Sequence, residues 1–477
     1  MDFFIILLAL GGLMYTAYRG YSVILFAPIF ALLAVAIIDP ANILPFYSGV
    51  FMEKMVGFIK SYFPVFLLGA IFGKIIEMSG IAESIAKTIV RLIGAKQAML
   101  TIVLLGAILT YSGVSLFVAV FAIYPFAVQL FKQADIPKRL MPATIALGAF
   151  TFTMDALPGT PQIQNVIPTT FFGTDIYAAP ILGIIGAIAV LIVGLFYLEF
   201  RKRQAMRKGE GYYGFPEEYE DTPNQDQEEK DPKPTLNLKD SIARRILAFV
   251  PLVLVAVMNN YLTKAIPEWY PNGFDFSAIG LDEYSIDVAS NVAIWSVEIA
   301  LVVGIITALL YDWKKVTNGI KEGLNKSIGG SLLAVMNTGS EYGFGGIIAA
   351  LPGFTKISDG ISGVFTNPLV NGAFTTSTLA GITGSASGGM GIALAAMGEK
   401  YNQAIAAANI SPEVMHRVVS MASGGMDTLP HNGAVITLLA VTGLTHKQSY
   451  KDIFAITIIK TLSVFVVIAL YTWFGII

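Results

Sequence analysis

The 477-residue sequence contains no cysteine and only three histidines. The absence of cysteine excludes disulfides, thiolate metal sites and cysteine nucleophiles, and we expect no metal or cofactor. Charged residues are also scarce, at 13% of the chain, against roughly 25% in soluble domains. A net charge of −2 provides no basic surface, so nucleic acid is excluded as a partner.

Apolar residues are abundant, at 55% of the chain, and the mean hydropathy is +0.67. A chain this apolar has too little polar surface to cover several water-facing cores, which excludes an ordinary soluble enzyme. The charged residues are concentrated in one segment, because residues 199–245 contain 21 of the 64 Lys, Arg, Asp and Glu residues. The composition therefore predicts a membrane-embedded body interrupted by one water-exposed linker.

The apolar segments predict an all-α polytopic membrane protein, since a helix needs about 20 apolar residues to cross the bilayer. Two segments, 98–131 and 368–407, are long enough to cross and return. We expect spans at residues 3–17, 21–38, 62–78, 98–131, 140–172, 178–200, 246–262, 292–310, 327–350, 368–407, 415–444 and 453–473.

Lys and Arg indicate the orientation, because they collect in cytoplasmic loops. The linker holds ten Lys and Arg residues. Residues 265–290 hold five acidic residues and no Lys or Arg. All basic loops fall on one side only if segments 98–131 and 368–407 are re-entrant hairpins. We therefore expect a cytoplasmic linker and both termini outside, in a bacterial inner (cytoplasmic) membrane, with residues 3–17 retained as a span.

Three features recur in the same order in the two halves. Met-Asp-Ala-Leu-Pro at 154–158 returns as Met-Asp-Thr-Leu-Pro at 426–430. Ser-Gly pairs at 112 and 387 each precede a proline by 25 residues. Glu77 and Glu341 precede the two hairpins at similar places.

This recurrence predicts two repeats, at 1–199 and 244–477, around a linker at 200–243. Each has about five crossings, one re-entrant hairpin and one broken helix. An odd number of crossings inverts the second repeat, which is the design of secondary transporters and not of enzymes. A duplicated scaffold or channel is the alternative.

The expected hairpin tips are rich in small polar residues. Backbone amides and hydroxyls at the start of a helix attract an anion such as a carboxylate. Close packing of small residues between membrane helices is the alternative explanation. The candidate substrate-binding residues at the tips are Ser112, Gly113, Ser115, Ser385, Ser387 and Gly388.

Proline and glycine interrupt the helices after both Met-Asp motifs and free backbone carbonyls. A carboxylate inside a span indicates a functional site, here one that takes up and releases a proton. A structural hydrogen-bond network is the alternative. The proton-coupling candidates are Asp155, Asp427 and His431, with Glu77 and Glu341 in second rank, and the substrate-binding candidates at the breaks are Thr160, Gln162, Gln164, Asn165, Thr428, His431 and Asn432.

Two further expectations concern charged groups near span ends. Lys74 lies one turn before Glu77, so these two side chains can simply pair. His416 and His446 fall near the ends of predicted spans, and we expect both at the membrane interface.

At several of these residues the chain resembles the GntP family, the gluconate-type proton symporters of the ion transporter superfamily. The resemblance covers nearly everything except the linker. Its most specific parts are Ile-Pro-Lys-Arg-Leu at 136–140, Phe-Thr-Phe-Thr-Met at 150–154, Leu-Pro-Gly-Thr-Pro-Gln at 157–162 and Gly-Ser-Ala-Ser-Gly-Gly at 384–389. It implies inverted repeats, a substrate site between hairpin tips and broken helices, a homodimer and an elevator motion.

The sequence departs from gluconate carriers at two places. Tip residues 111–117 lack a carboxylate, and the first break has Asp155 and Gln162 but no histidine. The chain is more similar to the branch associated with shorter hydroxy acids such as 3-hydroxybutyrate. We therefore expect proton-coupled symport of a small organic monocarboxylate, with a gluconate-like acid as the other possibility.

Two other functions fit part of the pattern. Substrate transport could be coupled to sodium instead of a proton, because carboxylate, hydroxyl and carbonyl oxygens at a helix break also bind Na⁺. Asp155 and Asp427 invite comparison with intramembrane aspartyl proteases. The Gly-x-Gly-Asp setting of such enzymes is missing, and a protease does not explain the repeats.

Overall fold

The computed structural model describes residues 2–19, 21–94, 97–114, 116–214, 242–354, 365–430 and 432–477. Within these ranges the chain is helical, and β-structure is limited to two isolated bridges, Gly211 with Gly214 and Phe274 with Ile286. The expectation of an all-α protein is confirmed for this part of the chain.

The first half alternates long helices with short and interrupted ones. Its elements are α1 (Asp2–Tyr18), α2 (Val23–Ile38), η1 (Pro40–Asn42), α3 (Ile43–Phe46), η2 (Tyr47–Phe51), α4 (Met52–Met78), α5 (Ile81–Ile93), α6 (Ala98–Tyr111), α7 (Leu116–Gln133), η4 (Lys138–Leu140), α8 (Met141–Ala149), α9 (Phe152–Asp155), α10 (Ile163–Phe172) and α11 (Pro180–Arg207).

The second half also alternates long helices with short and interrupted ones, and a broken helix precedes its last long helix. Its elements are α13 (Ile242–Leu247), α14 (Val250–Trp269), η6 (Phe276–Ile279), α15 (Val288–Tyr311), α16 (Trp313–Thr317), α17 (Ile320–Ala350), α19 (Pro368–Thr383), α20 (Ala386–Ala407), α21 (Pro412–Gly424), η7 (Gly425–Thr428), α22 (Gly433–Thr442) and α23 (His446–Phe474).

Five helical segments of the described chain are long and apolar enough to cross a membrane, which makes this an integral membrane protein. They are Pro40–Met78, Pro180–Arg207, Ile242–Trp269, Val288–Tyr311 and His446–Phe474. The first begins well before the predicted start at residue 62. Charged side chains at Glu53, Lys54 and Lys60 lower the apolar character of its first turns without interrupting the helix.

Small residues on α17 allow it to approach α4 closely. Gly339 lies against Met55 and Ile59, and a methyl group at Gly343 would lie 2.8 Å from the carbonyl oxygen of Phe51. Spacing of four residues places both glycines on one face of the helix. A side chain at Gly343 would push the two segments apart, and small residues at such positions are typical of close helix pairs in membranes.

The start of the linker docks on the helical body. The helix α11 continues past residue 199 to Arg207, and the Glu210 carboxylate accepts hydrogen bonds from Arg139 at 2.5 and 2.8 Å. The Arg139 guanidinium also bonds to Asp452 at 3.0 Å. The pKa of Arg139 is raised above its ordinary value, mainly by the hydrogen bond to the Glu210 carboxylate. Residues 215–241 of the predicted tether lie outside the described residues.

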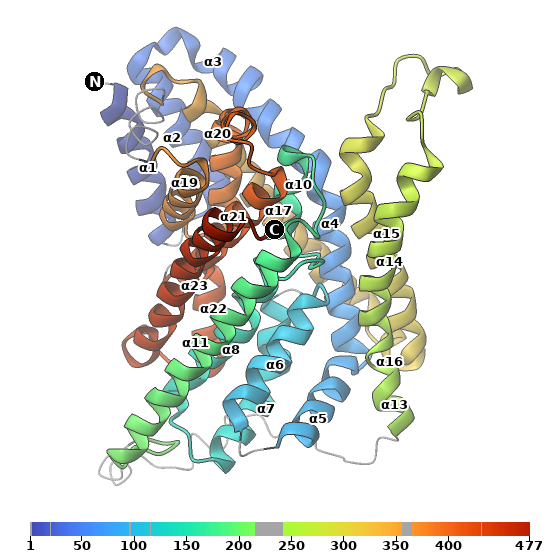
Figure 1. Cartoon of the computed structure of the whole chain (residues 1–477), viewed down its shortest axis with the longest axis vertical. Coiled ribbons are helices and arrows are strands. Elements are labelled where there is room, and N and C mark those ends of the chain that lie inside the picture. Colours follow the sequence, from blue (N-terminus) through green and yellow to red (C-terminus); the bar gives the residue numbers. More distant parts are fainter. Residues whose placement is uncertain are drawn as a thin grey trace.

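The charged ends of the helices are separated in space. In Figure 1 the end of α11, the start of α13 and the basic helix α16 lie towards one end of the molecule. The acidic loop that joins α14 to α15 projects from the opposite end. These three basic segments therefore lie at the end of the molecule opposite to the acidic loop (Figure 1).

Candidate functional site

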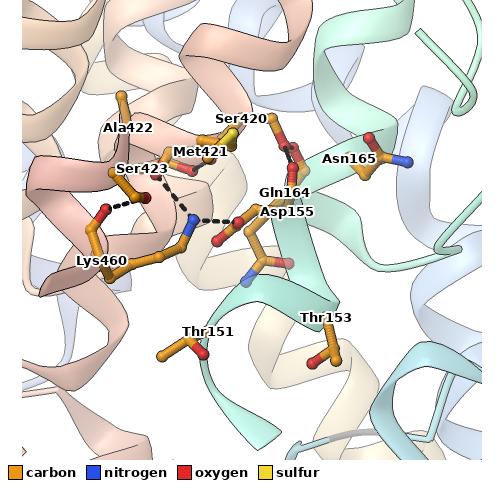
Figure 2. Close-up of polar contacts among 12 residues, drawn as sticks. Thr151, Thr153, Asp155, Gln164, Asn165, Ser420, Met421, Ala422, Ser423 and Lys460 are labelled. Atoms are coloured by element: carbon orange, nitrogen blue, oxygen red, sulfur yellow. Dashed lines mark hydrogen bonds and ion pairs between the residues drawn. The ribbon is translucent and has the colours of Figure 1, made fainter. Parts of the chain in front are cut away.

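Asp155 and Lys460 form an ion pair inside the protein. Asp155 ends α9 at the first helix break, and Lys460 projects towards it from the middle of α23 (Figure 2). Both side chains are fully buried, and the ammonium contacts Oδ1 of the carboxylate. The second oxygen, Oδ2, has no hydrogen-bond partner. Either charge left alone in this position would be strongly destabilising.

Arg417 holds the first break from the side of α21. Its fully buried guanidinium donates to the carbonyl of Ala178 from Nε at 3.1 Å and from Nη2 at 2.7 Å. Its Nη1 donates to the carbonyl of Asp155 at 2.8 Å and to Oδ1 of Asn165 at 2.9 Å. The planar guanidinium thereby satisfies carbonyls that the interrupted helix leaves free.

Asp427 connects the two breaks with the second hairpin. One carboxylate oxygen accepts from the backbone N–H of Ala386, at the start of α20, at 3.1 Å. It also accepts from Asn432 at 3.2 Å, and the other oxygen accepts from Gln164 at 2.8 Å. The carboxylate of Asp427 is therefore the anion at the N-terminus of α20, the position where the sequence predicts a substrate carboxylate.

Ser420 completes the connection between these groups. Its hydroxyl lies 2.9 Å from the Asp155 carbonyl and 2.8 Å from the Gln164 carbonyl (Figure 2). We call this connected set the central polar network. Its members are Asp155, Gln164, Asn165, Arg417, Ser420, Asp427, Asn432 and Lys460.

Each hairpin tip is bonded to the break in its own half by an amide side chain. Gln162 precedes α10 and donates to the carbonyls of Thr110 at 2.6 Å and Val114 at 3.2 Å. Asn432 precedes α22 and donates to the carbonyl of Gly384 at 2.8 Å. The two residues occupy the same structural position in the two halves and fix the tips in the same way.

The other predicted tip and break residues make local bonds. Ser112 bonds to the carbonyl of Ile108, Ser385 caps α20 by accepting from Gly388, Ser387 contacts Thr338, and Thr428 contacts Thr457. The Thr160 hydroxyl is buried without a partner. Gly113 has a φ of +92°, which a side chain rarely adopts, and a methyl group there would lie 3.1 Å from Pro161. Ser115 and His431 lie outside the described residues.

The two second-rank carboxylates differ sharply. Glu77 is 43% exposed and pairs with Lys74 at 2.9 Å, as the sequence allowed. Glu341 is 3% exposed, and its Oε2 atom has no partner. The structure places neither of them in the central polar network.

His416 is fully buried inside the protein, so the expectation of a side chain exposed at the membrane interface is wrong. Its ring is fully buried and contacts Thr174 at 2.7 Å and Asn165 at 3.2 Å. The reason is that α21 is enclosed by α10, α19 and α23, so its residues are buried from Val414 onwards. His446 is exposed near the start of α23, and its ring lies 2.9 Å from the carbonyl of Pro430.

The sequence reasoning missed three members of the central polar network, namely Ser420 and the two cations Lys460 and Arg417. Both cations lie within predicted spans, at 453–473 and 415–444, where any charged side chain is costly. The rule that selected Asp155 and Asp427 applies equally to cations, and it would have found both.

Removing the amide of Gln162 is expected to loosen the first hairpin tip. A leucine at this position removes the side-chain donor from the Val114 carbonyl, and an unpaired buried acceptor costs about 1–3 kcal/mol. The Thr110 carbonyl loses the same donor but keeps the backbone N–H of Gly113. We expect faster hydrogen exchange in the turn at 112–114 and at least a tenfold loss of transport rate. Asn402→Leu is the matched control, since its exposed amide donates to Phe171 at 2.8 Å. Unchanged exchange in Gln162→Leu would contradict the role of this amide.

Comparison with known proteins identifies the class. The model of the GntP family permeases matches residues 31–473. The chain therefore belongs to the GntP permease family, a family of membrane transporters and not of enzymes.

Individual proteins are similar to different degrees. The "Uncharacterized transporter YxjC" of Bacillus subtilis (strain 168) is 69% identical over 478 residues, with all of both chains covered. The solved structure of the Alcanivorax borkumensis YdaH transporter has a TM-score of 0.47 and 13% identity, with 89% of this chain and 88% of that one covered. A similarity of that size transfers neither topology nor mechanism.

Proposed function

We propose that the protein is a proton-coupled symporter that imports a small organic monocarboxylate by an elevator-type motion. The substrate class is a short hydroxy acid such as 3-hydroxybutyrate, with a gluconate-like acid as the second possibility. The proposal combines the family membership with the chemistry of the central polar network.

The observation that carries the proposal is a set of unsatisfied polar atoms at the first break. Asp155 Oδ2, Gln164 Oε1 and Thr160 Oγ1 are buried without hydrogen-bond partners. Most buried polar groups in proteins are paired, so three orphans in one short segment indicate a ligand site. Asp155 Oδ2 and Gln164 Oε1 can only accept, whereas the Thr160 hydroxyl can also donate, and acceptors suit the hydroxyl of a hydroxy acid or a proton.

Corresponding elements support the two inverted repeats and the hairpins. The helix pairs α6–α7 and α19–α20 each precede an interrupted helix and then a long helix, α11 or α23. The helices after the breaks, α10 and α22, both have 10 residues and end at a glycine with positive φ. Asp135 and Asn409, which follow the hairpins, share the left-handed backbone conformation. Paired hairpins and broken helices suit alternating access.

Proton coupling fits the network better than sodium coupling. A Na⁺ ion bound at Asp155 would lie beside the Lys460 ammonium, which already contacts Oδ1, and the two positive charges would repel each other. Both oxygens of Asp427 accept hydrogen bonds from N–H groups. Cationic and N–H donors therefore occupy positions that a second cation would require.

The remaining elements of the proposal concern placement and assembly. We place the protein in the bacterial cytoplasmic membrane with the linker in the cytoplasm and both termini outside. We also propose that it works as a homodimer, with each protomer moving its own substrate. Cysteine labelling from either side of a membrane tests the placement cleanly, because the natural chain has no cysteine.

Uptake by reconstituted protein tests the proposal. Proteoliposomes with an inward proton gradient and no sodium are expected to accumulate labelled 3-hydroxybutyrate, and a protonophore is expected to abolish the accumulation. Competition by gluconate, lactate and other short acids ranks the substrates. Accumulation only after sodium is added would establish the sodium-coupled alternative. No uptake of any of these acids would refute the substrate class.

A further inference from the structure

Glu341 is a buried carboxyl group that stands apart from the central polar network. Among the described residues, four other acidic side chains are buried: Asp155, Glu210, Asp427 and Asp452. Each of those four accepts at least one hydrogen bond or ion pair from a donor side chain. Glu341 has no such donor, and its Oε2 is unpartnered.

The Glu341 carboxyl lies against the first turn of α20, next to the tip of the second hairpin. Gly388 is the third residue of α20, and a methyl group at this position would overlap the carboxyl. The Thr338 hydroxyl, on the preceding turn of α17, lies 3.5 Å from the Ser387 hydroxyl. The carboxyl is therefore enclosed between α17 and a hairpin proposed to bind the substrate.

The elements around Glu341 bring no counter-charge to it. Neither α2 nor residues 386–398 of α20 contain a titratable side chain. On α4, the side chains of Glu53, Lys54 and Lys60 are exposed, with the stem of Lys54 packed on Gly346.

Three phenols are the other titratable groups near this level, among them the 39% exposed Tyr47 of η2, which packs on α17. Tyr62 on α4 donates to the carbonyl of Ile167 at 3.2 Å, and Tyr342 follows Glu341 on α17 and packs on Phe58. None of the three phenols carries a charge at neutral pH. Glu341 is thus buried among uncharged groups.

This environment distinguishes Glu341 from the two aspartates of the network. Asp155 has the Lys460 ammonium beside it, and Asp427 accepts three N–H groups, so both are stabilised as carboxylates. An ionised carboxylate without a partner is far more costly to bury than a neutral carboxylic acid. Glu341 therefore carries a proton in this conformation.

We propose that Glu341 is the binding site of the transported proton. This inference rests on the proposed function, since it assigns the proton of that symport to one residue. The neutral acid is compatible with α20 packed on α17. When the second hairpin moves and water reaches the carboxyl, Glu341 gives its proton to water and becomes the carboxylate. The proton thus enters and leaves in step with the hairpin that contacts the substrate.

The first test needs no substrate. Infrared spectra of the reconstituted wild type minus those of Glu341→Gln are expected to show the carbonyl band of a protonated carboxylic acid. Glu77→Gln is the matched control, because Glu77 holds the corresponding place on α4 but is exposed and paired with Lys74. The wild type minus Glu77→Gln spectrum is expected to lack that band. Absence of the band from the Glu341 difference spectrum would overturn the proposal.

The second test separates coupling from binding, with labelled 3-hydroxybutyrate as the probe. Glu341→Gln is expected to retain exchange of substrate between equal internal and external pools, within about twofold, and to lose accumulation against a gradient. Glu77→Gln is expected to accumulate as the wild type does. Normal accumulation by Glu341→Gln, or loss of exchange together with accumulation, would overturn the assignment. If accumulation by the wild type did not depend on the proton gradient, the proposed function itself would be refuted.

Discussion

Replacing Lys460 by methionine is expected to abolish coupled uptake and to destabilise the folded protein by about 3–5 kcal/mol. The Asp155 carboxylate would then remain fully buried without its cation. The thermal unfolding midpoint in detergent reports the stability, and proteoliposome uptake reports the function. Lys202→Met is the control, because Lys202 pairs with Glu199 near the surface and such pairs contribute about 1 kcal/mol or less.

The double variant Lys460→Met/Asp155→Asn separates the two effects. Removing both charges leaves no unpaired ion, and replacement of a whole buried pair is often neutral for stability. We expect the double variant to unfold near the wild-type temperature while remaining inactive. Recovery of stability without recovery of uptake would show that the pair serves transport. A double variant as unstable as Lys460→Met would contradict the direct pairing of these two residues.

Replacing Arg417 by methionine is expected to disrupt the first break and to abolish transport. The substitution leaves the carbonyls of Ala178 and Asp155 and the side-chain oxygen of Asn165 without the Arg417 donors. The Ala178 carbonyl loses both of its donors, which costs about 1–3 kcal/mol for a buried acceptor, while the Asp155 carbonyl keeps Ser420 and the Asn165 oxygen keeps its contact with His416. The expected result is a large fall in the unfolding temperature and no measurable uptake.

Arg417→Lys tests whether shape or charge matters. Lysine keeps the positive charge but lacks the planar fork that reaches several acceptors together, so we expect only partial recovery of stability and no recovery of uptake. Arg203→Met is the control, since the Arg203 side chain is 71% exposed. Full activity of Arg417→Lys would show that a point charge is sufficient at this position.

Much of the helical organisation follows from local sequence signals. Proline and glycine at 158–161 predict the interruption between α9 and α10, and the structure has it. Small residues at 112–114 and 384–385 predict the turns between paired helices, which the structure also has. These features depend on backbone preferences that neighbouring residues determine, so sequence reasoning reaches them.

The contacts within the site depend on distant residues, and sequence reasoning reaches fewer of them. Gln164 and Asp427 are 263 positions apart, and no local pattern pairs them. The position of Lys460 inside an apolar segment is enough to mark it as a candidate, but nothing in the sequence shows that it pairs with Asp155. The burial of His416 depends on the three helices around α21, which its position near a span end does not reveal.

Proton movement with the substrate is the most direct test of the central claim. Proteoliposomes that contain a pH-sensitive dye are diluted into sodium-free buffer at equal internal and external pH, and 3-hydroxybutyrate is then added outside. A proton symporter is expected to acidify the lumen at a rate that follows substrate uptake, and empty liposomes provide the background. Substrate uptake with no acidification, appearing only when sodium is supplied, would contradict the claim.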